Sequence, residues 1–82
     1  DTTVLSKPYK LSSSKVTGVK KYSTYSRIEV ATADGTCTVL VDGKTKIKKG
    51  NTVDVYFVAT NAQVEKSKVH VYGLAKAVTK SK

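Results

Sequence analysis

The sequence contains no methionine or tryptophan, and it has one cysteine, one histidine and one proline. A single cysteine, Cys37, excludes both an internal disulfide framework and a cysteine-based zinc cluster. Because Cys37 lies inside an apolar strand pattern, we expect it to pack as a small hydrophobic residue, and we expect a reducing, cytoplasmic compartment, with a virion or secreted location left open. A chain without methionine that begins at Asp1 is expected to be processed, trimmed or part of a longer protein.

Long apolar runs are also lacking. No run approaches the roughly 18 residues that a membrane-spanning helix requires, and no segment has the pattern of a signal peptide. The 82 residues are enough for one domain with a modest core but not for a deep active-site cleft. We therefore expect one small domain with no membrane partner.

Acidic residues are scarce: six Asp and Glu stand against fifteen Lys and Arg, for a net charge of +9. Fourteen of these cations are lysine, and Arg27 is the one arginine. Lysine suits phosphate contacts as a point charge, whereas the planar fork of arginine reads guanine edges. The charge therefore favours contact with a polyanion backbone and little reading of sequence, with a merely solubilising surface as the alternative.

Residues for catalysis are few. His70 lies within a strand pattern without a partner nearby in sequence, and Asp34 and Asp42 each precede a glycine, where turn formation explains them. No nucleophile elbow, phosphate-binding loop or metal-ligand spacing is present. We expect a non-enzymatic protein with no metal and no cofactor.

Helical periodicity is nearly absent, and β-branched residues alternate between recurrent turn signals, which predicts an all-β domain. The pattern predicts five strands, over residues 15–22, 26–33, 36–41, 52–59 and 69–75. Residues 1–14 are predicted to be an N-terminal arm with a short pairing segment at Tyr9 and Leu11, residues 15–76 a barrel, and residues 77–82 a basic tail.

Glycines and polar segments set the predicted turns. Asp34-Gly35 predicts a tight hairpin turn with positive φ values, and Gly18 predicts a bend or bulge in the first strand. Residues 44–50 are predicted to be a lysine-rich mobile loop anchored by Ile47. Residues 61–68 are predicted to be a polar loop between the last two strands.

Three phrases occur in an order typical of one family: KVTGVKKY, then a hairpin through Asp-Gly, then IKKGNTVDVYF. The sequence in this respect resembles the short bacterial OB-folds of the cold-shock and translation initiation factor 1 type. The resemblance implies a five-stranded antiparallel OB-like barrel and a nucleic-acid partner. SRIEVATA and TCTVLV stand where the cold-shock family carries aromatic motifs, so no functional residue of that family is carried over. An SH3-like barrel would use a similar strand pattern and is the alternative.

Tyrosines flanked by lysines are what a binder of single strands needs, because bases stack on the rings while lysines neutralise phosphates. Tyr22 and Tyr25 flank the first predicted turn, and Tyr56 and Tyr72 have the outward phase of their strands. The candidate nucleic-acid-binding residues are Lys20, Lys21, Tyr22, Tyr25, Arg27, Lys44, Lys46, Lys48, Lys49, Tyr56, Lys66, Lys68 and Tyr72.

Three functions fit these features. The first is a sequence-tolerant nucleic-acid-binding module that prefers single strands of DNA or RNA. The second is a structural or interaction protein, such as a virion component or a subunit of a complex, that assembles into oligomers through exposed strand edges and tyrosines. The third is a cationic secreted domain that binds anionic polysaccharide or a membrane surface, of which the membrane is the weaker option because the sequence has no basic amphipathic helix.

Overall fold

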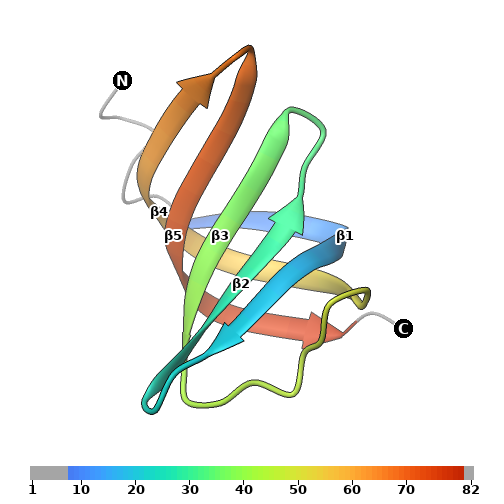
Figure 1. The fold of residues 1–82 in the computed structure, drawn as a ribbon, viewed down its shortest axis with the longest axis vertical. Coiled ribbons are helices and arrows are strands. Elements are labelled where there is room, and N and C mark those ends of the chain that lie inside the picture. Colours follow the sequence, from blue (N-terminus) through green and yellow to red (C-terminus); the bar gives the residue numbers. More distant parts are fainter. Residues whose placement is uncertain (1–7, 81–82) are drawn as a thin grey trace.

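The computed structural model describes residues 8–80, which form five strands. They are β1 (Pro8–Lys21), β2 (Tyr25–Ala31), β3 (Gly35–Asp42), β4 (Thr52–Glu65) and β5 (Lys68–Lys80). The strands close into a barrel in the order β1-β2-β3-β5-β4, as Figure 1 shows. Placing β5 between β3 and β4 is the Greek-key arrangement of a small OB-like barrel, which selects this fold over the SH3-like alternative.

The barrel is mixed rather than wholly antiparallel, because β3 and β5 pair in parallel. The physical reason is the connection over residues 43–51. It carries the chain across one end of the barrel, so that β4 pairs with β1 and β5 then runs beside β3 in the same direction. The prediction of an antiparallel barrel was therefore correct for four of the five strand pairings and wrong for this one.

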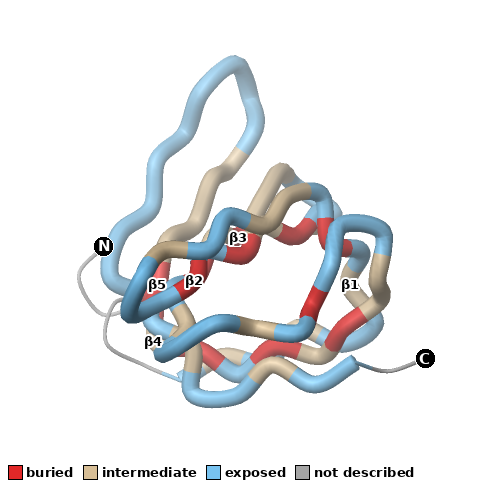
Figure 2. Tube along the Cα trace, turned by 60° about the horizontal axis from the view of Figure 1, so that its bottom comes forward, coloured by how far each residue is buried: buried red, intermediate tan, exposed pale blue. Residues whose placement is uncertain are grey.

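Alternating residues of the strands face the inside of the barrel and form its core. Figure 2 shows the buried positions recurring along the strands around the barrel. Burying each valine or isoleucine side chain stabilises the fold by about 1.5–3 kcal/mol. The buried residues are Val16, Ile28, Val30, Cys37, Val39, Ile47, Val53, Val55, Phe57 and Ala59. The predicted packing of Cys37 as a small hydrophobic residue is thus confirmed.

The first strand begins earlier than predicted. Pro8–Ser14, assigned to an arm, belongs to β1 and pairs with β4, including the expected pairs at Tyr9 and Leu11. Two register shifts, between Leu11 and Ser14 and between Val16 and Gly18, bend β1 so that its halves pair with different strands. The bulge predicted at Gly18 is confirmed, and residues 1–7 of the predicted arm lie outside the described residues.

The last two strands form a long hairpin where a polar loop and a basic tail were predicted. β4 continues to Glu65, and β5 remains paired with β4 as far as Lys80; residues 81 and 82 lie outside the described residues. The upper part of this hairpin projects from the barrel, and residues 60–68 around its tip are all exposed (Figure 2). A stretch of strand that buries neither face has no apolar alternation, which is why the sequence pattern did not reveal residues 60–68 as a continuation of the hairpin.

Gly35 has a role that differs from the predicted one. The hairpin between β2 and β3 forms as predicted, but Gly35 does not have a positive φ. A Cβ atom at this position would lie 2.0 Å from the backbone oxygen of Val69, so glycine is required where β3 and β5 approach each other. The amide of Val69 donates to the carbonyl of Asp34 (2.9 Å), which begins the parallel pairing.

The lysine-rich connection at 43–51 is fastened to the barrel rather than free. The amide of Gly50 donates to the carbonyl of Val16 (2.9 Å), and the amide of Val16 donates to that of Asn51 (2.8 Å). Ile47 is buried beneath the connection, as its predicted anchor role requires. The expected mobile loop is therefore a well-bonded cover over one end of the barrel.

Candidate nucleic-acid interface

The turn after β1 carries a stack of two tyrosine rings and a lysine. The rings of Tyr22 and Tyr25 lie 4.5 Å apart between centroids and are inclined by 20°. The Lys20 ammonium lies 5.5 Å from the centre of the Tyr22 ring, within the range of a cation–π contact. The amide of Tyr22 donates to the carbonyl of Tyr25 (2.8 Å), which closes the turn and holds the rings together. Tyr25 is 37% exposed.

Strand register extends this stack into a continuous surface. Lys20 lies opposite Arg27, Arg27 opposite Leu40, and Leu40 opposite Leu74, so one row crosses β1, β2, β3 and β5. A parallel row on the same face places Glu29 opposite Thr38 and Thr38 opposite Tyr72. We name the following residues the stacking face: Lys20, Tyr22, Tyr25, Arg27, Leu40, Tyr72 and Leu74.

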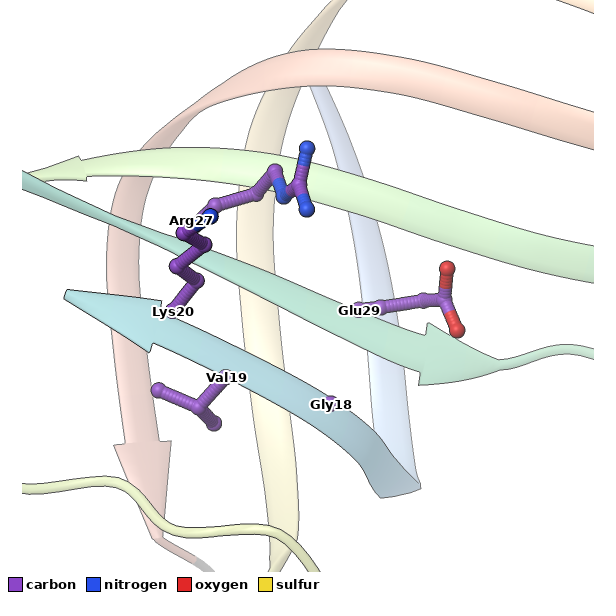
Figure 3. A pocket seen from close by; sticks show the side chains of 5 residues that line it. All are labelled: Gly18, Val19, Lys20, Arg27 and Glu29. Carbon is purple, nitrogen blue, oxygen red and sulfur yellow. The ribbon is translucent and has the colours of Figure 1, made fainter.

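Two like charges lie directly opposite each other within this face. Lys20 and Arg27 are cross-strand partners, an arrangement that is destabilising when nothing neutralises it. Glu29 is on the same face, but its carboxylate accepts a hydrogen bond from the Thr17 hydroxyl (2.9 Å). Figure 3 shows the charged ends of Arg27 and Glu29 apart, so the two cations remain available to an anion.

The stacking face is hollowed in three places. A hollow of about 370 Å³ lies over Gly18, Lys20 and Arg27 (Figure 3). Tyr25, Leu40 and Leu74 line a second one of about 490 Å³. Arg27 and Tyr72 line a third of about 190 Å³, together with the same two leucines. Leu40 and Leu74 thus form an exposed apolar ridge between two hollows, each beside an aromatic ring.

Ser26 is a residue of this region that sequence reasoning missed. It is fully buried, and its hydroxyl donates to the Gly43 carbonyl (2.7 Å) and accepts from the Thr45 amide (3.1 Å). In this way the strand that carries Tyr25 and Arg27 holds the beginning of the 43–51 connection. The available signal was a serine in the inward phase of β2, where Ile28 and Val30 are apolar.

The predicted binding lysines do not all meet at the stacking face. Lys21 ends β1 opposite Ser26 and is exposed beside it. Lys66 and Lys68 lie at the tip of the β4–β5 hairpin, at the other end of the molecule from the tyrosine turn (Figure 1). The remaining four are exposed along the connection at the barrel end: Lys44, Lys46, Lys48 and Lys49.

Tyr56 is separated from the other candidate tyrosines. It is exposed on the outer side of β4, between Lys10 of β1 and Ala77 of β5. The Lys10 ammonium lies 5.2 Å from the centre of the ring, and its interaction with Tyr56 raises the pKa of Lys10. Tyr56 and Tyr72, which share the outward phase in the sequence, are therefore on different sides of the barrel.

His70 and Cys37, the remaining side chains that could take part in chemistry, are packed within the fold. His70 is half-buried, and its Nδ1 lies 2.9 Å from the Thr36 hydroxyl. Burial raises the pKa of the Cys37 thiol to about 11, which keeps it protonated. Within residues 8–80, no three His, Cys, Asp or Glu side chains are grouped closely enough to hold a metal ion.

Comparisons with protein-family models, with curated proteins and with solved structures found no match. The part of the chain that the structure describes contains no helix long and apolar enough to cross a membrane.

Proposed function

We propose that this protein binds single-stranded nucleic acid through the stacking face, without marked sequence preference. The observation that carries the proposal is the like-charged pair Lys20 and Arg27 held next to the stacked rings of Tyr22 and Tyr25. A phosphate between the two cations would relieve their repulsion, while a base could stack on the exposed side of Tyr25. Both contacts are indifferent to base identity.

The absence of a guanine-reading arrangement supports sequence tolerance. Arg27 is the single arginine, and its neighbours across the strands are Lys20 and Leu40. Lysine–phosphate contacts and stacking on aromatic rings bind DNA and RNA strands of any sequence. A duplex hides the faces of its bases, so we expect it to bind more weakly than a single strand.

The test is a fluorescence-anisotropy titration with labelled single-stranded and duplex oligonucleotides at about 50 and about 200 mM salt. Tyr25→Ala removes the exposed stacking surface, and we expect it to weaken single-strand binding by about 1–3 kcal/mol, or roughly 5- to 150-fold. Tyr56→Ala is the matched control, because it removes an exposed tyrosine from the other side of the barrel. Equal losses in both variants, or no binding by the wild type at the lower salt, would contradict the proposal.

Assembly is a second candidate function, favoured by the projecting hairpin. Val64 near its tip is 74% exposed. Exposed apolar side chains on a strand can pair with another chain. Sedimentation over a range of protein concentrations tests this function: oligomers that form without any salt-dependent oligonucleotide binding would place assembly first.

A further inference from the structure

The positive charge is concentrated away from the stacking face. Within residues 8–80, the stacking face, its turns and the projecting hairpin hold five cations against four acids. These acids are Glu29, Asp34, Asp42 and Glu65. The remaining segments, 8–15, 43–56 and 75–80, hold eight lysines and one acid, Asp54. The Asp54 carboxylate already accepts a hydrogen bond from the amide of Ser13 (2.8 Å).

Several of these lysines converge at the end of the barrel that the 43–51 connection covers. The turn at Lys48–Gly50 is bonded to Val16 of β1, the residue after Lys15. Lys80 of β5 pairs with Val53 of β4, which pairs on its other side with Ser14, next to Lys15. We name this group the basic end; its members, all exposed, are Lys15, Lys46, Lys48, Lys49 and Lys80.

Backbone bonds hold these lysines in place. The Asn51 side-chain oxygen accepts from the Lys48 amide (2.9 Å), and the Asn51 amide donates to the Lys48 carbonyl (3.0 Å). With Ile47 buried beneath, the backbone positions from which the neighbouring lysines extend are set before any ligand arrives. A pre-ordered backbone loses less conformational entropy on binding, so lysines presented from it are well suited to an extended anion.

The basic end is continuous with the stacking face. The Gly43 amide donates to the carbonyl of Thr24, in the tyrosine turn (2.9 Å), and Ser26 holds the next residues of the connection. Lys21 and Lys44 are exposed along this junction. A strand that leaves Tyr25 therefore meets a lysine-lined route around the end of the barrel.

We propose that the basic end is a second contact surface of the same nucleic-acid strand, one that binds phosphates only. This inference rests on the function proposed for the stacking face. Residues 43–53 contain no aromatic side chain, so the bases on this stretch stay unstacked by the protein. The stacking face then binds a few nucleotides, and the basic end extends the site toward the upper part of the range of about 4–16 nucleotides for OB-folds.

The test compares oligothymidylates of about 5 and about 20 nucleotides, titrated across salt concentration. Lys48→Ala/Lys49→Ala removes two charges from the basic end. Lys10→Ala/Lys76→Ala removes two charges near Tyr56. These positions lie several residues away from the basic end along β4 and β5, so this variant is a control with the same net charge. A phosphate contact on a single strand contributes about 0.7 to the slope of log K against log salt.

For the basic-end variant we expect the slope to fall by about 1.4 on the long oligonucleotide and its affinity at about 50 mM salt to drop about tenfold or more. Its affinity for the short oligonucleotide should stay within about twofold, and the control variant should bind both like the wild type. Equal weakening by both variants would overturn the inference, because net charge alone would then explain the loss.

Two outcomes separate this inference from the function on which it rests. A wild-type protein that binds the short and the long oligonucleotide with equal affinity and slope overturns the second surface while leaving the stacking face intact. A wild-type protein that binds neither, at either salt concentration, overturns the proposed function and this inference together.

Discussion

Ser26 lies on the inward side of β2, between Tyr25 and Arg27, which point outward to the stacking face. A buried polar group is costly unless it is bonded, and the hydroxyl of Ser26 meets this condition with two backbone groups of the 43–51 connection. It therefore couples the strand that carries the aromatic site to the segment that carries the lysines.

We expect Ser26→Ala to lower the free energy of unfolding by about 1–3 kcal/mol, because the Gly43 carbonyl and the Thr45 amide would lose their shared partner. Urea denaturation measures this change. Ser23→Ala, at an exposed position of the adjacent turn, is the control and should change stability by less than about 0.5 kcal/mol. Equal effects of the two substitutions would show that the buried hydroxyl does not fasten the connection.

At the scale of elements, the β4–β5 hairpin turns through two residues that are poorly suited to its geometry. Lys66 and Ser67 have φ values of 50° and 67°, the pair of positive values that a type I′ turn requires. Side chains other than glycine and asparagine are disfavoured there. The polar Lys-Ser pair consequently carried no turn signal in the sequence, and the hairpin was predicted as a loop.

Ser67→Gly should stabilise this hairpin by about 1 kcal/mol, since glycine adopts a positive φ without the steric penalty. Hydrogen exchange of the amides of Glu65 and Lys68, which pair across the turn, should slow by about fivefold. Ser67→Ala keeps the penalty and should leave exchange unchanged. If the glycine variant exchanges as fast as the wild type, the turn is not strained in solution.

At the scale of the whole molecule, the barrel places the stacking tyrosines and most of the lysines on different parts of its surface, a separation that the composition does not reveal. The three tyrosines of the stacking face lie on the turn before β2, on β2 and on β5, whereas most of the lysines lie around the covered end and along β1 and β5. Inside, the closed core excludes water from Cys37, whose pKa of about 11 reflects the cost of burying a thiolate.

The buried thiol predicts a loss of stability in alkali. Between its ordinary value of 9.0 and about 11, the unfolded thiol is ionised while the folded one keeps its proton. The unfolded state then binds fewer protons, so the free energy of unfolding falls as pH rises, by at most about 1.4 kcal/mol per pH unit. Urea denaturation at about pH 8 and about pH 10 measures the slope.

Cys37→Ala is the control, because lysines and tyrosines also titrate in alkali. This variant should be less stable at neutral pH, having lost core volume, but its stability should fall less steeply than that of the wild type above about pH 9. Identical slopes in the two proteins would mean that the thiol is not held in its protonated form by the fold.

The candidate site was predictable where it depended on one turn and the strands beside it. Tyr22 and Tyr25 flank the same short turn, so their proximity to each other and to Lys20 followed from the sequence alone. Tyr72 and Tyr56 share the same outward phase on consecutive strands, yet the bulges of β4 and the register of β5 carry them to different sides. Phase shows which way a side chain points but not which part of a closed barrel it reaches.

Alternation of valine and isoleucine with polar residues by itself determined the all-β class, the inward residues of β2 and β4, and the hairpin between β2 and β3. These are local properties, because neighbouring residues on a strand must face opposite sides. Only the tertiary structure decided the parallel pairing of β3 with β5, the need for glycine at position 35 and the convergence of the lysines of the basic end. Each of these depends on contacts between segments far apart in the chain, which a local pattern does not encode.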